Sequence, residues 1–90
     1  MKVVITGGAG FLGMRLARRL LERGQLTGTS GRQEPIDEIV LLDVVAASGI
    51  EDKRISTMVG DIADPAVIAR ALDAATSSVF HLAAVVSGEA

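Results

Sequence analysis

The sequence predicts an α/β fold in which these 90 residues supply the first half of a doubly wound parallel sheet. Short apolar segments, each of about four to eight residues, alternate with segments of helical periodicity, which is typical of parallel strands joined by right-handed crossovers. A glycine-rich turn separates the first strand from the first helix, and an aspartate ends the second strand. The expected order of elements is β-α-β-β-α-β, which predicts the strand order 3-2-1-4 in the sheet.

The first strand and the first helix have the clearest patterns. Residues 2–6 are apolar and β-branched after the lysine, as expected for a central parallel strand that is covered on both faces. Residues 11–23 have helical periodicity, and the glycine at position 24 is placed to end the helix. The residues that share the apolar face of this helix are Gly13, Leu16, Ala17, Leu20 and Gly24.

The next segment is predicted to be a long loop over residues 25–37, because it is small and polar and Pro35 excludes a regular helix. The second strand covers residues 38–42 and ends at Asp43. Residues 44–52 are then expected to be irregular.

A third strand, a second helix and a fourth strand complete the chain. The third strand covers residues 54–59, and the fourth begins at position 77 or 78 and continues through residue 86. Asp64 and Pro65 suit the N-cap and the first position of a helix over residues 65–75. Its apolar stripe consists of Val67, Ile68, Ala71, Leu72 and Ala75.

Composition narrows the classes of function. A content of 49% apolar and 22% charged residues predicts a globular chain of one domain at most. A net charge of −2 and only two aromatic residues argue against nucleic acid as a partner. No segment approaches the ~20 consecutive apolar residues of a membrane span, and no signal peptide is recognised. The absence of cysteine suits a reducing compartment, so we expect a cytoplasmic protein.

The glycine-rich turn is the first candidate site, because a turn between a buried strand and a helix can hold a phosphate. Gly7 allows a sharp turn, Gly10 leaves room for a pyrophosphate, and Gly13 allows the helix to pack close to the strand. The helix offers unpaired N–H groups and the positive end of its dipole to an anion, and we assign Phe11 and Leu12 to the same site. The glycines alone are weak evidence, but the flanking strand, helix and acid make them strong.

Two strand ends carry acids that suit the adenosine half of a dinucleotide. Asp43 would accept hydrogen bonds from ribose hydroxyls, and its carboxylate would repel a 2′-phosphate, so NAD is expected rather than NADP. Asp61 would accept a hydrogen bond from the adenine amine, with Ile62 against the ring. The alternatives are a solvated loop acid at position 43 and a simple turn residue at position 61.

The other polar candidates are weaker. His81 is the one histidine, and a structural role is favoured over a catalytic one; without a second histidine or a cysteine no metal site is expected. Ser87 either contacts substrate or is an ordinary loop serine. A basic run on the first helix is interpreted as a solvated face, with an acidic partner surface as the alternative. Its members are Arg15, Arg18, Arg19 and Arg23.

Taken together, these residues resemble the extended short-chain dehydrogenase/reductase family, which includes nucleotide-sugar epimerases. Residues 6–13 match its T-G-x-x-G-x-x-G motif, and the acids at positions 43 and 61 match its ribose and adenine positions. His81-Leu82-Ala83-Ala84 matches its H-x-A-A segment, which lies along the cofactor toward the nicotinamide. The resemblance implies a Rossmann-type fold with NAD as cofactor, and it places Leu82, Ala83 and Ala84 at the cofactor.

A narrower resemblance, over residues 31–38 and 79–90, is to a sugar-acid oxidoreductase of this family. It implies oxidation of a secondary hydroxyl with transfer of hydride to NAD. The alternatives are a nucleotide-sugar epimerase or dehydratase of the same family, which would act on a nucleotide sugar, and a non-catalytic NAD-binding module.

The family's catalytic Tyr-x-x-x-Lys pair is missing, since the chain has no tyrosine. We therefore expect residues 1–90 to be the inactive N-terminal part of a dinucleotide-binding domain, in a longer protein whose substrate domain is absent here. The resemblance allows that longer protein to be a homodimer. An isolated fragment should be marginally stable and should aggregate through the open edge of its fourth strand.

Overall fold

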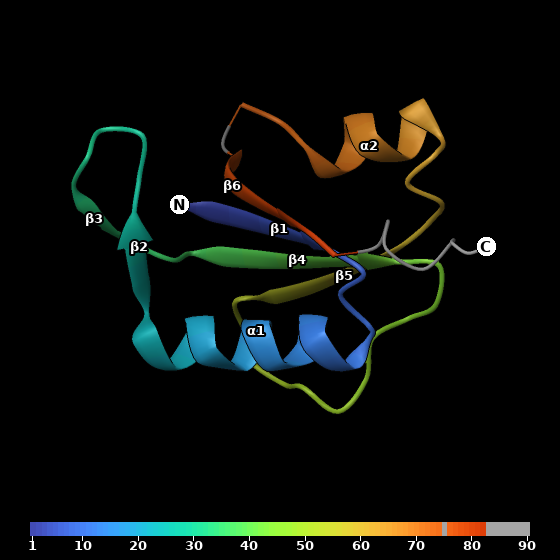
Figure 1. Ribbon diagram of the computed structural model, residues 1–90, viewed down its shortest axis with the longest axis horizontal. Coiled ribbons are helices and arrows are strands. Elements are labelled where there is room, and N and C mark those ends of the chain that lie inside the picture. The colour runs from blue at the N-terminus through green and yellow to red at the C-terminus, as the bar shows by residue number, and fades with distance from the viewer. Residues whose placement is uncertain (75, 83–90) are drawn as a thin grey trace.

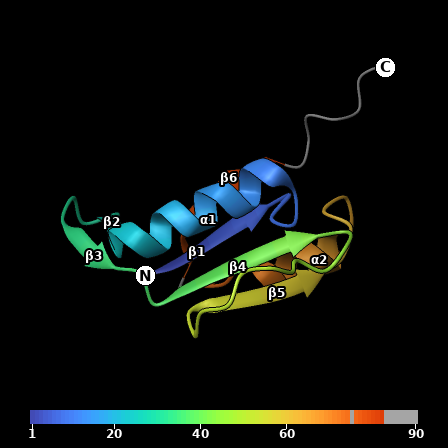
Figure 2. The same ribbon diagram turned by 90° about the horizontal axis from the view of Figure 1, so that it is seen from below.

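The computed structural model describes residues 1–74 and 76–82 of the chain. Four parallel strands form one sheet, with α1 (Phe11–Arg23) on one face and α2 (Pro65–Ala71) on the other (Figure 1, Figure 2). Their spatial order is β5-β4-β1-β6, which confirms the predicted order 3-2-1-4 and the doubly wound parallel sheet. The strands are β1 (Lys2–Thr6), β4 (Glu38–Asp43), β5 (Ile55–Val59) and β6 (Thr76–His81).

Each face of the sheet has its own apolar core. Val3 and Ile5 of β1 pack on the α1 side with Leu20, whereas Val4 packs on the α2 side with Val67. Successive side chains of a strand point to opposite faces, so a strand covered on both faces needs apolar residues throughout. This requirement explains why β1 and β4 are continuously apolar.

Both helices have the predicted capping residues. Gly24 ends α1 with a φ of 77°, and its N–H donates to Leu20 O at 2.8 Å. Asp64 begins α2, and its Oδ1 accepts from Ala66 N–H at 2.9 Å. The buried residues of α1 are Gly13, Met14, Ala17 and Leu20, of which Met14 lay outside the predicted apolar face.

The second helix is shorter than predicted. It ends at Ala71, because Leu72 already has an extended backbone with φ −104° and ψ 125°. Asp73 and Thr76 form a turn in place of another helical turn: Thr76 N–H donates to Asp73 O (3.0 Å), and Asp73 N–H donates to Thr76 Oγ1 (3.1 Å). The prediction to residue 75 was therefore wrong beyond residue 71, and Ala75 itself lies outside the described residues.

The predicted loop over residues 25–37 is in fact an antiparallel hairpin. Its strands are β2 (Gln25–Thr27) and β3 (Gln33–Pro35), and they lie at the end of the sheet where the parallel strands begin (Figure 1). Gly31 has a φ of 82° and donates its N–H to Gly28 O at 3.0 Å, which closes the turn. Pro35 is tolerated because β3 is an edge strand. Proline has no N–H to donate, and on the open side of an edge strand no donor is needed.

The remaining segments agree with the sequence. Residues 44–54 connect β4 to β5 without a helix or a strand, as expected for residues 44–52; β5 begins at Ile55, one residue later than predicted. Among the described residues, β6 pairs with β1 along one edge, and no strand lies along its other edge. The predicted continuation of β6 over residues 83–86 lies outside the described residues. None of the described helices is long and apolar enough to span a membrane.

Candidate functional site

Three glycines after β1 are required by the fold itself. Gly7 has a φ of 76°, and the N–H groups of Gly7 and Gly8 both donate to Leu42 O (2.8 and 3.1 Å), which turns the chain over the end of β4. A Cβ at Gly8 would lie 2.7 Å from the Cα of Leu41, and a Cβ at Gly13 would lie 2.4 Å from Gly7 O. Gly13 thus packs against the turn rather than against the strand, and the role of Gly8 was missed by the sequence analysis.

Gly10 is different, because the protein itself leaves room for a side chain there. Its φ of −79° and ψ of 171° are open to any residue. The nearest atom to a Cβ at this position would be Gly7 O at 3.4 Å, an ordinary contact. Folding therefore does not explain the glycine, whereas the need for free space in front of the turn does.

The N-terminus of α1 is open to an anion. Met14 N–H donates the first intrahelical bond to Gly10 O (3.0 Å), so the N–H groups of the three preceding residues have no intrahelical acceptor. No side chain caps this end and no acid lies in the first turn, so no group of the helix itself compensates the positive end of its dipole. The side chains of Phe11 and Leu12 are 75% and 65% exposed, so their contribution would come from the backbone.

Asp43 is fixed where β4 ends. Its Oδ2 accepts from Ala9 N–H of the glycine turn (3.0 Å), and its Oδ1 accepts from Val44 N–H (2.7 Å). Its main-chain oxygen accepts from Gly60 N–H at the end of β5 (2.9 Å). The carboxylate is therefore held in one place by two amides before any ligand arrives.

The ends of β5 and β6 complete the surroundings. Asp61 is exposed, its Oδ1 accepts from Ala63 N–H (2.9 Å), and the adjacent Ile62 packs against the α2-side core. At the end of β6, the buried Thr6 Oγ1 accepts from Leu82 N–H (3.1 Å) and lies 2.8 Å from His81 Nδ1. His81 thus has a structural partner, and Thr6 is a residue to which the sequence analysis gave no separate role.

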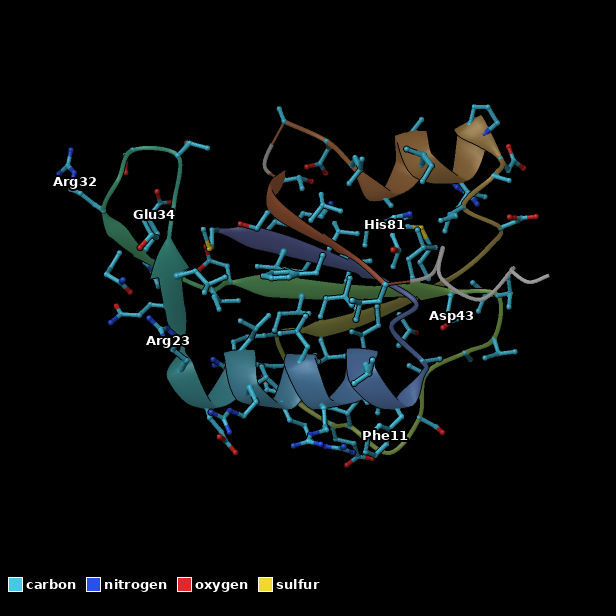
Figure 3. The ribbon with its side chains drawn as sticks, viewed as in Figure 1. Phe11, Arg23, Arg32, Glu34, Asp43 and His81 are labelled. Carbon is cyan, nitrogen blue, oxygen red and sulfur yellow. The ribbon has the colours of Figure 1, made fainter. Side chains whose placement is uncertain are left out.

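These strand ends enclose a pocket of about 350 Å³. Each of the four strands of the sheet contributes, and Asp43 marks the place in Figure 3. A crevice outside the carboxyl ends of parallel strands is where open α/β sheets bind their ligands. The lining residues are Gly7, Gly10, Asp43, Val44, Asp61, Ile62 and Leu82.

All of the lining residues except Val44 were predicted to contact the cofactor. Val44 was not predicted to be a contact, although its position directly after the acid of a strand end was a usable signal. Phe11, Leu12 and Gly13 belong to α1 but do not line the pocket. The predicted residues Ala83, Ala84 and Ser87 lie outside the described residues.

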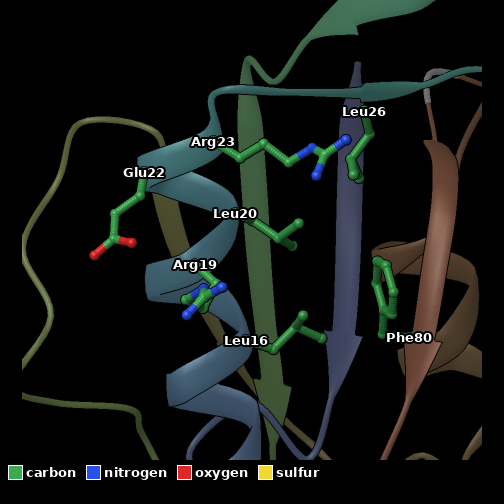
Figure 4. Close-up of a pocket in the computed structure, with 7 residues that line it drawn as sticks. All are labelled: Leu16, Arg19, Leu20, Glu22, Arg23, Leu26 and Phe80. Atoms are coloured by element: carbon green, nitrogen blue, oxygen red, sulfur yellow. The ribbon is translucent and has the colours of Figure 1, made fainter.

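A second hollow, which we call the α1 groove, lies between α1 and β6 and has a volume of about 530 Å³ (Figure 4). Its lining is mostly apolar, with two arginines and a glutamate from the outer face of α1. The lining residues are Leu16, Arg19, Leu20, Glu22, Arg23, Leu26 and Phe80.

The basic run of α1 is exposed but not merely solvated. Arg18 Nη2 donates to Gly49 O at 2.9 Å, and Arg23 Nε donates to Gln25 O at 3.2 Å. The guanidinium of Arg15 lies over the ring of Phe11, 5.7 Å from its centre. The interpretation as a simple solvated face was therefore incomplete.

Known proteins share this fold and these motifs. The model of the NAD dependent epimerase/dehydratase family matches residues 3–90. The whole chain is 56% identical to a D-erythronate dehydrogenase from Cupriavidus necator and 38% identical to another from Haemophilus influenzae, and it covers 28% and 26% of their lengths. A dTDP-glucose 4,6-dehydratase from Streptomyces venezuelae, solved with NAD bound, superposes with a TM-score of 0.70 at 31% identity, over 92% of this chain and 26% of that one.

The chain thus spans about a quarter of the length of the curated relatives it matches. The resemblance to a sugar-acid oxidoreductase is confirmed, since D-erythronate dehydrogenase is such an enzyme. NAD, the cofactor predicted from the glycine turn and Asp43, is the cofactor of the family. By its sequence motifs, its sheet order and the match over residues 3–90, the chain belongs to the NAD dependent epimerase/dehydratase family.

Proposed function

We propose that this chain binds the adenosine and pyrophosphate half of NAD, as the N-terminal part of an oxidoreductase. The observation that carries the proposal is the pocket. Gly10, Asp43 and Asp61 come from separate turns of the chain, and all three line this one pocket. The open helix end suits the pyrophosphate, because its amides and its dipole both favour negative charge. The open space at Gly10 is where such a group would lie.

Each residue of the site is assigned to a different part of NAD. Asp43, held by the amides of Ala9 and Val44, would accept hydrogen bonds from the hydroxyls of the adenosine ribose. Asp61 and Ile62 would take the adenine, as acceptor and apolar surface. Leu82 would lie toward the nicotinamide, together with Ala83 and Ala84.

Asp43 and Val44, which lie side by side in the pocket lining, favour NAD over NADP. A 2′-phosphate would meet the carboxylate of Asp43, and neighbouring Val44 offers no positive charge to bind it. Bringing like charges together in a partly buried site is unfavourable.

For the complete protein we propose oxidation of a secondary hydroxyl of a sugar acid similar to D-erythronate. When bound, NAD supplies the acceptor for the hydride that leaves the hydroxyl-bearing carbon. The hydroxyl proton must pass to a base, and the family's tyrosine is not among these 90 residues. Ser87 is proposed to contact the substrate. This narrower function is supported by the identity to two D-erythronate dehydrogenases.

Titration of the chain with NADH tests the cofactor proposal. The chain has no tryptophan and no tyrosine, so the nicotinamide fluorescence can be read with little protein background. We expect saturable binding of NADH, competition by NAD and ADP, and at least about tenfold weaker competition by NADP, because one repelled phosphate costs on the order of 1.4 kcal/mol. The absence of saturable NADH binding by a folded chain that has not aggregated would refute the proposal.

Further measurements distinguish two alternative functions from the sugar-acid reaction. A nucleotide-sugar dehydratase or epimerase is favoured by the structural match to dTDP-glucose 4,6-dehydratase, and a non-catalytic NAD-binding module is the other alternative. The intact mass of the protein from its native source distinguishes the module, for which it would be 9.3 kDa, from a longer enzyme. For the longer enzyme, NADH production with D-erythronate, and none with nucleotide sugars, would support the sugar-acid reaction.

A further inference from the structure

The connection between β4 and β5, residues 44–54, borders the pocket with its first residue and continues along α1. It begins at Val44, which lines the pocket beside Asp43, and passes under α1 in the view of Figure 1. Ala47 and Ile50 pack against the core on the α1 side. The connection has no helical or strand hydrogen bonds of its own, so its position depends on the few contacts that hold it.

The two ends of the connection are well fastened. At its start, Asp43 accepts from Val44 N–H and from Ala9 N–H. At its end, Arg54 donates from its main-chain N–H and from its Nε to Asp52 Oδ1, both at 2.9 Å. These contacts fix the residues that adjoin β4 and β5, but none of them reaches the middle of the connection, where Ala47 and Ile50 have apolar packing alone.

Arg18 of α1 forms a hydrogen bond with the middle of the connection. Its Nη2 donates to Gly49 O at 2.9 Å, where Gly49 bends the chain with a φ of 83°. No other hydrogen bond joins residues 45–51 to the rest of the described chain. A charged donor makes a stronger hydrogen bond than a neutral one, so this contact adds to the apolar packing of Ala47 and Ile50 in limiting how far the connection moves from α1.

We propose that Arg18 is a positioning residue for the adenosine end of the cofactor site, acting through Gly49 on the wall at Val44. The inference rests on the proposed binding of NAD. If Gly49 is released, the connection is less closely held against α1. Asp43 still holds Val44 by its N–H, but the exposed side chain of Val44 then has a less fixed position at the edge of the pocket. Apparent affinity falls in proportion to the share of molecules that keep the binding-competent arrangement.

Arg18→Met tests this role, because methionine keeps an unbranched apolar stem and loses the donors. Arg19→Met is the matched control: Arg19 is the next residue of the same helix, but it faces the α1 groove. We expect Arg18→Met to lower the affinities for NADH and for ADP by the same factor, about threefold to tenfold. Loss of one exposed charge-assisted hydrogen bond would have an effect of this size. Arg18→Lys, which restores a charged donor, should recover part of the affinity, and Arg19→Met should change nothing.

Amide hydrogen exchange gives a readout that does not depend on the cofactor. Without ligand, Arg18→Met should speed exchange at residues 45–51 and leave β1 and β4 unchanged, whereas a general loss of stability would speed exchange everywhere. If the wild-type chain binds NADH and the Arg18→Met and Arg19→Met variants bind it with equal affinity, the inference is overturned and the proposed function still stands. If the wild-type chain does not bind NADH at all, the proposed function fails and the inference fails with it.

Discussion

The pocket at the strand ends has a volume of about 350 Å³, whereas the α1 groove has about 530 Å³. The groove is lined by leucines, a phenylalanine and long charged side chains from the exposed face of α1. The pocket is lined by two glycines, two carboxylates and three aliphatic residues, all at or just after the ends of the four strands of the sheet. The smaller hollow is the one where polar groups from distant parts of the sequence converge.

The two hollows also differ in what their residues do for the fold. Leu20 in the groove is 5% exposed and belongs to the α1-side core, so folding alone explains it. Gly10 in the pocket is explained neither by its backbone angles nor by packing. The site of a ligand is thus better indicated by residues that folding does not require than by the size of a hollow.

The largest effect is expected from Gly10→Val. The β-branched side chain would occupy the space proposed for the pyrophosphate, so NADH affinity should fall by at least about 1,000-fold, on the order of 4 kcal/mol. The backbone angles at this position accept valine, and the loss of helix stability at the N-cap should be about 1 kcal/mol. NADH titration and thermal unfolding of the same samples measure the two quantities.

Gly10→Ser is the control for capping. Serine is a good N-cap residue, so the chain should be at least as stable as wild type, yet its side chain still enters the pocket. A stable serine variant that binds NADH as well as wild type would show that the space at Gly10 is not needed by the cofactor.

Leu20→Ala should have the opposite pattern. Removing a buried leucine side chain from the floor of the α1 groove should lower the free energy of unfolding by about 3 kcal/mol. The dissociation constant of NADH, measured where the variant is still folded, should not change. Leu16→Ala is a milder control, because Leu16 is only half-buried. Weaker NADH binding by folded Leu16→Ala would contradict the separation of the two hollows.

Asp43→Asn sharpens the assignment inside the pocket. The amide keeps one oxygen as acceptor but removes the charge, so NADH affinity should fall by about tenfold, on the order of 1.4 kcal/mol. The preference for NAD over NADP should shrink, because the 2′-phosphate is no longer repelled. Equal losses for NADH and NADPH would remove Asp43 as the residue that discriminates between them.

The sequence predicted those parts of the fold that long apolar patterns encode. β1, β4 and α1 each have a continuous or periodic apolar pattern, and topology rules then supply the strand order. The hairpin was missed because β2 and β3 have only three residues each, too few to show alternation. The early end of α2 depends on the turn of Asp73 and Thr76, whose polar contacts carry no periodicity.

The site was predicted to the extent that it is local. The glycine turn and the acids at strand ends could be found because each follows directly from an element of known direction. The partner of Arg18 could not, since Gly49 lies 31 positions further along the chain. Gly8 was missed for the same reason, because its crowding arises from Leu41 of a different strand.

The smallest effect is expected at Asp52, which lies outside both hollows. The side-chain hydrogen bond from Arg54 lowers the pKa of Asp52 to about 2, from an ordinary value of 3.8. Because the pKa is lower in the folded than in the unfolded chain, this carboxylate stabilises the fold above about pH 4, and the contribution is lost as the pH falls toward 2. Asp52→Asn should therefore flatten the fall in melting temperature between pH 4 and pH 2, and it should leave NADH binding at pH 7 unchanged. An unchanged slope would mean that Asp52 and Arg54 do not hold each other in solution, and that the end of the connection is fixed by main-chain hydrogen bonds such as that from Ile39 N–H to Arg54 O (2.7 Å).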